Sequence, residues 1–347
     1  MKILMVSRRF PPDVRSGTET VFASLWAEAR KGHDVRLLVG YRGSPEGFPP
    51  EAVAVDLRRG VAHLTMLRAA QAEVARFRPD VVLSNSVEVV PRGAPTALLV
   101  HDLNFGKAER DAGTFLREQL YRLQGRRVAQ VIAVSDATRE ALRPLGIDAV
   151  TIHNGVDVAR FVPREAPPSD VVRFAYPARI LPGKGQHALL DAVGRMRPDQ
   201  RRRVRVTIVG AVADRLYADR LRILAYEQPV DILEDVPDIV PFYQDADVIV
   251  FPSLMTEGFG FTAVEGMACG KPVIFYDQPA VREATGGLAV PVPRDDPGAL
   301  RDAMLKLAAD PAERARLGRA GRAYVEARSW GKVWARYEEV LVRISRA

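Results

Sequence analysis

The residues whose types and spacing could do chemistry are densest between Phe251 and Ile274. An apolar, strand-like run ends there, and Gly258 and Gly260 follow it and permit backbone geometry that other residues resist. A short helix is expected at 262–268. Free N–H groups and the positive end of the helix dipole would then meet at one point, which suits the oxygens of a phosphate or a sugar.

Two carboxylates accompany this turn. Glu257 lies at its mouth, and Glu265 lies eight residues further on, about two turns inside the expected helix. A carboxylate binds pairs of hydroxyl groups well, so two of them near an anion-binding turn suggest a sugar and a ribose as ligands. The alternative is an ordinary acidic first turn with a solvated glutamate, and the spacing alone does not decide between them.

A second cluster is cationic. Arg179 and Lys184 lie five residues apart on a glycine-containing loop, directly before an expected helix. Such a pair can grip a diphosphate, although it can also be a plain surface loop.

A third candidate is His101, which directly follows an apolar run at 96–100. Residues at the carboxyl ends of parallel strands point into the ligand crevice of an α/β sheet. Most isolated histidines are structural, but this position favours a ligand-facing role for His101, with Asp102 as an orienting neighbour.

Apolar runs alternate with helical periodicity along the whole chain, which predicts an α/β fold with parallel sheets. Strands are expected at 2–7, 35–39, 80–84, 96–100, 128–134, 150–154, 171–175, 204–210, 247–251, 273–276 and 289–292, and helices at 20–31, 58–77, 116–127, 135–145, 187–196, 214–226, 236–244, 262–268, 297–309, 311–327 and 330–344. The proline-rich segment at 163–169 is expected to link two domains.

Composition limits the class of protein. The 347 residues, 47% of them hydrophobic, are enough for two cores. No run approaches the length of a membrane span, Met1 to Val6 is expected to be a strand rather than a signal peptide, and the single cysteine, Cys269, fits a reducing cytoplasm. The net charge of +7 admits nucleic acid, an anionic membrane or phosphorylated small molecules as partners. No nucleic-acid-binding motif appears, so nucleic acid is not expected as a partner.

Two arginine-rich helical segments, at 58–77 and 116–127, have two interpretations. They are either solvated charged faces or patches that touch anionic lipid headgroups at the inner face of the membrane. Leu64, Leu67 and Val74 are expected on the buried side of the first segment.

The order Pro-Ser, Glu-Gly-Phe-Gly and Glu-Gly-Met-Ala-Cys-Gly-Lys-Pro-Val within 252–273 closely resembles the signature of family 4 of the retaining glycosyltransferases. The loop 178–185 is similar to the Gly-Arg-x4-Lys-Gly loop of that family, with Ala178 in place of the glycine. Ser16-Gly17-Thr18-Glu19 is similar to its Gly-Gly-x-Glu loop, with Ser16 in place of the first glycine.

The resemblance implies the GT-B architecture, in which two Rossmann-like domains carry parallel sheets facing a cleft between the domains. The first, acceptor-side domain would span 1–163 and take back the C-terminal helix 330–347. The second, nucleotide-sugar-binding domain would span 170–329.

The resemblance also implies roles for particular residues. Those expected to act on the reacting groups are Arg179 and Lys184, which hold the leaving phosphates, and Glu257 and His101, which contact the donor sugar. Those expected to bind the rest of the donor are Gly17, Gly258, Phe259, Gly260 and Glu265, with Glu265 on the ribose.

The implied reaction is transfer of a hexose from a UDP- or GDP-linked donor to a hydroxyl group of a glycan, a lipid-linked molecule or a small molecule. No metal ion or other cofactor is expected, and Asp245 and Asp247 are interpreted as structural. Two alternatives stay open: a nucleotide-sugar epimerase or phosphorylase on the same scaffold, and a basic protein that docks on membranes or nucleic acid without catalysis.

Overall fold

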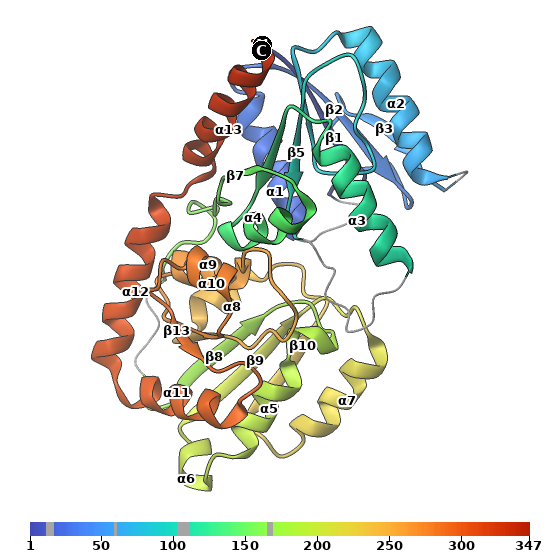
Figure 1. Cartoon of the computed structure of the whole chain (residues 1–347). Coiled ribbons are helices and arrows are strands. Elements are labelled where there is room, and N and C mark those ends of the chain that lie inside the picture. The colour runs from blue at the N-terminus through green and yellow to red at the C-terminus, as the bar shows by residue number, and fades with distance from the viewer. Residues whose placement is uncertain (12–16, 59–60, 103–111, 165–168) are drawn as a thin grey trace. The chain divides into compact units, whose positions relative to one another are not determined.

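The structure is a computed structural model that describes residues 1–11, 17–58, 61–102, 112–164 and 169–347, without the side chains of 112–114 (Figure 1). The chain divides into two compact units. Unit 1 comprises Met1–Gly155 together with Trp330–Ala347, and unit 2 comprises Val156–Ser329. Ser16 and most of the expected linker lie outside the described residues.

Unit 1 contains a sheet of seven described strands, all parallel, in the order β3-β2-β1-β4-β5-β6-β7. The strands are β1 (Lys2–Ser7), β2 (Asp34–Tyr41), β3 (Val53–Asp56), β4 (Val81–Ser84), β5 (Thr96–Val100), β6 (Gln130–Ala133) and β7 (Ala149–Thr151). The helices are α1 (Gly17–Ala29), α2 (Ala62–Phe77), α3 (Ala112–Gly125), α4 (Asp136–Leu142), the 3-10 helix η1 (Arg143–Leu145) and α13 (Trp330–Ser345).

Unit 2 contains a sheet of six described strands, also parallel, in the order β10-β9-β8-β11-β12-β13. The strands are β8 (Val172–Pro177), β9 (Val204–Gly210), β10 (Val230–Glu234), β11 (Val248–Phe251), β12 (Val273–Tyr276) and β13 (Val290–Val292). The helices are the 3-10 helix η2 (Pro182–Lys184), α5 (Gln186–Gly194), α6 (Pro198–Arg201), α7 (Arg215–Ala225), α8 (Val240–Asp245), α9 (Phe261–Ala268), α10 (Pro279–Ala284), α11 (Pro297–Ala309) and α12 (Pro311–Glu326).

The order of the strands reverses once in each sheet, between β1 and β4 in unit 1 and between β8 and β11 in unit 2. Strands at the centre of such sheets are buried on both faces, so their sequences are continuous apolar runs. All four residues of β11 are buried, as are all five of β5. Ligands of open α/β sheets bind outside the carboxyl ends of the strands where the order reverses, so each unit has one such point.

Side-chain caps begin several helices where the sequence places Ser or Asp. Ser135 caps α4, because its hydroxyl accepts a hydrogen bond of 3.1 Å from the Thr138 amide. Asp214, Asp296 and Asp310 cap α7, α11 and α12 in the same way.

Some predictions of elements were wrong. Strand β3 was not predicted, because it is a short edge strand without a fully buried residue. Helix α2 begins at Ala62, and its buried face is Met66, Ala70, Glu73, Val74 and Phe77. Leu64, predicted to be buried, is 44% exposed.

The first unit ends at Gly155 rather than near 163. The reason is that Val156 and Phe161 already pack in the hydrophobic core of unit 2. Of the described helices, none is both long enough and apolar enough to cross a membrane.

Candidate functional site

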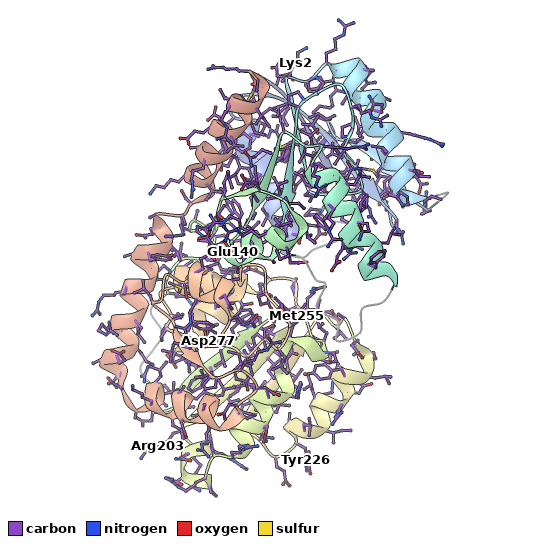
Figure 2. The ribbon with its side chains drawn as sticks, viewed as in Figure 1. Lys2, Glu140, Arg203, Tyr226, Met255 and Asp277 are labelled. Atoms are coloured by element: carbon purple, nitrogen blue, oxygen red, sulfur yellow. The ribbon has the colours of Figure 1, made fainter. Side chains whose placement is uncertain are left out.

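Two loops meet where the strand order of unit 2 reverses. One follows β8 and contains η2, and the other follows β11 and contains Met255, which is labelled in Figure 2. The amides of Leu254 and Met255 both donate to the carbonyl oxygen of Gly183, at 2.9 and 2.8 Å. The two loops are therefore fixed to each other by main-chain hydrogen bonds.

Gly185 makes this close approach sterically allowed. Its φ is +72°, and a Cβ at this position would collide with the carbonyl oxygen of Pro252. The glycine after Lys184 is therefore required both by the backbone conformation and by the neighbouring loop.

The two loops bring the predicted residues Lys184 and Glu257 together. Lys184 Nζ lies 2.7 Å from Glu257 Oε1, and the two side chains are 14% and 13% exposed. The Ser253 hydroxyl donates to the same carboxylate oxygen, and Lys184 Nζ lies 5.8 Å from the centre of the Phe251 ring. A cation and an acid are thus held together at the carboxyl edge of the sheet.

Arg179 lies on the loop after β8, and its side chain is exposed. Its carbonyl oxygen accepts a hydrogen bond of 2.8 Å from the buried Gln186 side chain, which fixes the main chain of the loop. The guanidinium group makes no hydrogen bond or ion pair with the other described side chains, so its five N–H donors are available to a ligand.

Helix α9 begins at this edge with Gly260 as its N-cap, at φ +97°. A Cβ on Gly260 would lie 3.0 Å from Val281 Cγ2, so a side chain here would strain both the backbone and the packing. Phe259 is 4% exposed and packs against Phe261 at 5.2 Å between ring centres. Its side chain belongs to the core, so only its main chain is placed to contact a ligand.

Glu265 lies on α9 and is half-buried. Burial raises its pKa to about 7, while a hydrogen bond from Tyr243 and the charge of Arg160 act in the opposite direction. The Tyr243 hydroxyl donates to Glu265 Oε2 at 2.6 Å.

Unit 1 has its own polar cavity where the strand order reverses, with a volume of about 270 Å³. The residues that line it lie at the ends of β1 and β5, follow β1, β4 and β5, or belong to α1 and α3: Ser7, Arg8, Arg9, Thr18, Glu19, Asn85, Ser86, Val87, Glu88, Leu99, His101, Asp102, Arg117 and Tyr121. Arg8 and Glu88 form an ion pair of 3.0 Å in its wall. The cavity therefore offers donors and acceptors of hydrogen bonds, with charges of both signs.

His101 lines this cavity, as its position after β5 predicts. Burial lowers the pKa of its ring to about 4, so the imidazole is neutral near pH 7. Nε2 has no hydrogen-bond partner among the described residues. Gly17 is the first residue of α1 and is exposed, and it directly precedes Thr18 in the cavity wall.

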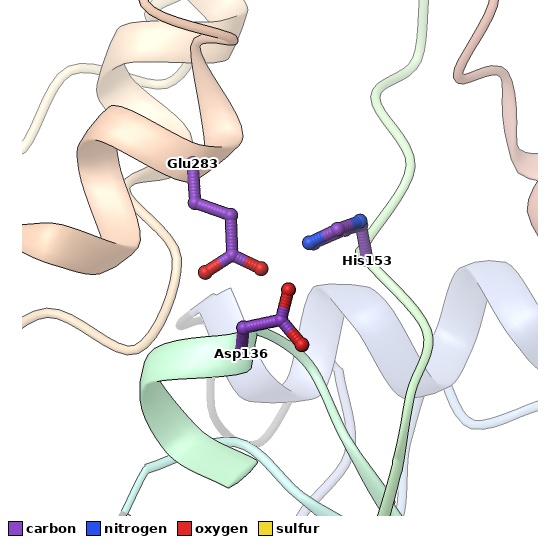
Figure 3. A group of neighbouring side chains, drawn as sticks. All are labelled: Asp136, His153 and Glu283. Atoms are coloured by element: carbon purple, nitrogen blue, oxygen red, sulfur yellow. The ribbon is translucent and has the colours of Figure 1, made fainter. Parts of the chain in front are cut away.

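Asp245 and Asp247, interpreted as structural in the sequence, have structural partners. Asp247 accepts three hydrogen bonds of 2.8 to 3.1 Å from Arg173, and Asp245 pairs with Arg164. In unit 1, a ring nitrogen of His153 lies within 4.8 Å of a carboxylate oxygen of Asp136 (Figure 3). Thr151 Oγ1 donates a hydrogen bond of 2.6 Å to Asp136.

Sequence reasoning missed three residues that hold the site of unit 2. Ser253 is fully buried and bonds to Glu257. Gln278 accepts a hydrogen bond of 2.9 Å from the Glu257 amide and donates one of 2.8 Å to the Ser253 carbonyl. Tyr243 binds Glu265. The Pro-Ser pair was an available signal for Ser253, whereas Tyr243 and Gln278 act across the fold and carry no local signal.

Two parallel-sheet Rossmann-like units, each with a polar site at the reversal of its strand order, define the GT-B class of glycosyltransferase folds. Residues 16–160 match the family described as Glycosyltransferase Family 4, and residues 171–310 match Glycosyl transferases group 1. The chain belongs to family 4 of the glycosyltransferases.

The chain is also similar to individual curated glycosyltransferases. A D-inositol 3-phosphate glycosyltransferase of Saccharomonospora viridis is 34% identical over 224 residues, 58% of this chain and 50% of that protein. A GDP-mannose-dependent monoacylated alpha-(1-6)-phosphatidylinositol monomannoside mannosyltransferase of Corynebacterium glutamicum is 31% identical over 214 residues, 54% of each chain. The chain thus spans about half the length of these curated relatives.

The fold is also that of HepE from Anabaena, crystallised in complex with UDP and glucose. The TM-score is 0.78 at 20% identity, and the match covers 99% of this chain and 100% of HepE.

Proposed function

We propose that the protein is a retaining glycosyltransferase that moves a sugar from a UDP- or GDP-linked donor to a hydroxyl group of an acceptor in glycan, glycolipid or glycosylated-metabolite biosynthesis. The observation that carries the proposal is the arrangement in unit 2. Lys184, Glu257 and the N-terminus of α9 occur on loops at the reversal point of one parallel sheet, with Arg179 exposed on the same loop as Lys184.

The chemistry that this arrangement serves is the departure of a diphosphate. The bond between the anomeric carbon and the phosphate oxygen breaks, so negative charge grows on the phosphate while the sugar carbon becomes positive. Arg179, Lys184 and the amides of Gly258 to Gly260 would stabilise that charge, and one such preorganised donor is worth roughly 2.7–4 kcal/mol. The proposed reaction therefore uses no metal ion.

The other predicted residues would orient the donor. Glu257 and the neutral ring of His101 would contact the sugar, Glu265 would bind the ribose, and Gly17 would lie near the phosphates. The acceptor oxygen would attack on the face that the phosphate leaves, and the phosphate oxygen would take the acceptor's proton. This same-face route retains the anomeric configuration and needs no separate base.

The relatives support a nucleoside-diphosphate sugar as the donor, but they do not distinguish uridine from guanosine as its nucleoside. HepE was crystallised with UDP and glucose, whereas the Corynebacterium enzyme is GDP-mannose-dependent. For the acceptor we propose the cavity of unit 1, whose mixed charges and hydroxyl groups suit a polyhydroxylated molecule.

Peripheral contact with an anionic membrane is part of the proposal. Helix α3 exposes Phe115, Leu116 and Leu123, at 62%, 69% and 50%, close in sequence to Arg117, Arg122, Arg126 and Arg127. Exposed apolar side chains next to arginines are what an anionic lipid surface attracts.

A nucleotide panel tests the assignment. We expect UDP, GDP or one of their sugar derivatives to raise the melting temperature. A ligand at about one hundred times its Kd adds about 2.7 kcal/mol of stability, or roughly 5 to 10 °C in a domain of this size. Arg179→Ala should leave the melting temperature of the free protein unchanged, because the side chain is exposed, and should abolish the response.

The matched control is Arg202→Ala, an exposed arginine that follows α6 at the amino end of β9. This variant should respond to nucleotide as the wild type does. A protein that responds to no nucleotide contradicts the assignment. Product analysis of a responding donor, with and without acceptor, separates transfer from epimerisation, and the anomeric configuration of the product tests retention.

A further inference from the structure

The carboxylate of Glu265 is held by one tyrosine. It lies on α9, half-buried, and its Oε2 atom accepts a hydrogen bond of 2.6 Å from the Tyr243 hydroxyl. Among the described residues, Tyr243 is the sole hydrogen-bond partner of this side chain, so Oε1 keeps its acceptor capacity for another molecule.

The tyrosine itself is rigidly placed. Tyr243 lies on α8, is fully buried, and packs edge-on against Phe161 at 5.4 Å and 90°. A buried ring with fixed neighbours has little rotamer freedom, so its hydroxyl has one position. Tyr243 is separated from Glu265 by 22 residues, so this contact depends on the fold of unit 2 and not on a local motif.

We propose that Tyr243 is a positioning residue of the donor site: its hydroxyl binds one oxygen of Glu265 and leaves the other oriented toward the hydroxyl groups of the ligand. The inference rests on the proposed function in one respect, namely that Glu265 binds the ribose of a nucleotide. It adds a residue that does not itself touch the ligand.

The same hydrogen bond affects the charge of the acid. Burial raises the pKa of Glu265 to about 7, and the hydrogen bond from Tyr243 and the positive charge of Arg160 limit that rise. The other titratable group that interacts with it is Cys269, whose thiol is kept neutral because burial raises its pKa to about 12. Arg160 pairs with Asp238 at 2.8 Å and is thereby fixed.

The sign of the pH dependence follows. Above the pKa, Glu265 is ionised and both oxygens accept hydrogen bonds. As the pH falls through about 7, the acid takes up a proton and loses acceptor capacity, so nucleotide affinity should fall. Removal of the Tyr243 hydroxyl should raise the pKa further, because the ionised form loses a hydrogen bond.

The test is the pH profile of UDP and GDP binding by calorimetry, from about pH 6 to about pH 9, for wild type and Tyr243→Phe. We expect the midpoint of the profile to move up by about one to two pH units, the size expected for loss of a hydrogen bond to a charged group. At about pH 7 the variant should bind about tenfold more weakly, with a loss that shrinks as the pH rises.

The matched control is Tyr276→Phe. Tyr276 is also fully buried in unit 2, and its hydroxyl has no partner in the described part of the chain. This variant removes the same atom without removing a hydrogen bond, so its profile should coincide with that of the wild type.

The outcomes separate the two proposals. If wild type binds neither UDP nor GDP, the proposed function fails. If wild type binds but Tyr243→Phe keeps the wild-type midpoint, or binds more weakly by one constant factor at every pH, the positioning role is overturned.

If Tyr243→Phe does not fold, Glu265→Gln replaces it in the test, because the amide oxygen of the glutamine can still accept a hydrogen bond from Tyr243. The profile of this variant should lose the step at about pH 7 and keep only the titration of the nucleotide's own terminal phosphate, whose pKa is about 6. A profile with the wild-type midpoint would show that another group of the protein titrates.

Discussion

At the scale of single residues, Lys184 and Glu257 form an ion pair that is largely shielded from solvent. The two side chains are 14% and 13% exposed and lie 2.7 Å apart. Removal of one partner from a buried pair is strongly destabilising because it leaves the other charge without compensation. The stability of unit 2 is therefore linked to residues of its proposed donor site.

Lys184→Met should lower the free energy of unfolding of unit 2 by about 3 to 5 kcal/mol. The double variant Lys184→Met/Glu257→Gln should regain part of that loss, with a coupling energy of about 1 to 3 kcal/mol. Urea unfolding of the two single variants and the double variant measures this cycle.

A matched cycle on Arg197 and Asp199 is the control, since that pair is 69% and 60% exposed. Exposed pairs contribute about 0 to 1 kcal/mol. A coupling between Lys184 and Glu257 as small as that of the exposed pair would contradict the interpretation.

Single residues of the candidate site could be predicted from the sequence only in part. Types and spacing indicated Lys184, Glu257 and Glu265 because charge and glycine patterns are local. Their partners Tyr243 and Gln278 could not be predicted, because the hydrogen bonds that they make cross 22 and 21 positions of the chain. Residues so far apart in the sequence come into hydrogen-bonding distance only when the chain folds.

At the scale of elements, α3 presents an apolar ridge. Phe115 and Leu116 are 62% and 69% exposed in its first half. A face of this kind on a soluble helix usually marks an interaction site. Helix α7 of unit 2 exposes Leu216 and Ile223 to 83% and 75%, which provides an internal comparison.

Phe115→Ser/Leu116→Ser should weaken binding to vesicles that contain phosphatidylglycerol by at least about tenfold. Each of these exposed side chains would be buried in lipid on binding and would then contribute roughly 1.5–3 kcal/mol. Co-sedimentation with vesicles measures the effect, and vesicles of phosphatidylcholine alone test the role of the arginines. Leu216→Ser/Ile223→Ser should bind as the wild type does, because the arginines beside them, Arg215 and Arg222, are paired with Glu234 and Asp219. The reverse pattern would place the membrane contact on α7.

The elements themselves were predictable to different degrees. The bounds of β5 and β12 were predicted correctly, because these parallel strands are uninterrupted or nearly uninterrupted apolar runs between turn residues. The bounds of β9 were also predicted correctly, although Arg205 and Thr207 interrupt its apolar residues. Edge strand β3 was missed. In α2 the prediction was right for Val74 and wrong for Leu64, because Met66 and Ala70 face the core where Leu64 was expected. Edge strands and alanine-rich faces give weak hydrophobic periodicity.

At the scale of the whole molecule, unit 1 is made of two separate parts of the chain. The chain leaves it after Gly155 and returns at Trp330 as α13, which packs against α1 in Figure 1. The face of α13 that packs on unit 1 is apolar: Trp330, Val333, Trp334, Tyr337, Leu341 and Ile344 are buried. The Nε2 atom of His33 lies 2.9 Å from Glu338 Oε1 and adds a polar contact.

Deletion of 330–347 should therefore unfold unit 1. The buried side chains of α13 contribute about 1.5–3 kcal/mol each, which together approaches the roughly 5–15 kcal/mol that stabilises a domain. Calorimetry should show loss of one transition while the transition of unit 2 remains and still responds to nucleotide. Deletion of Arg346 and Ala347 alone, both exposed, should change neither transition. A truncated protein that keeps both transitions contradicts this dependence.

The two ends of unit 2 meet. Val156 forms an isolated parallel bridge with Ser329, and its amide donates to the Arg328 carbonyl at 3.1 Å. A segment that enters and leaves through adjacent points can be inserted into a host fold without rerouting the host's own strands. Unit 2 can thus be exchanged as a cassette during evolution, and recombination at 155–156 and 329–330 offers a simple way to change what it recognises while unit 1 is preserved.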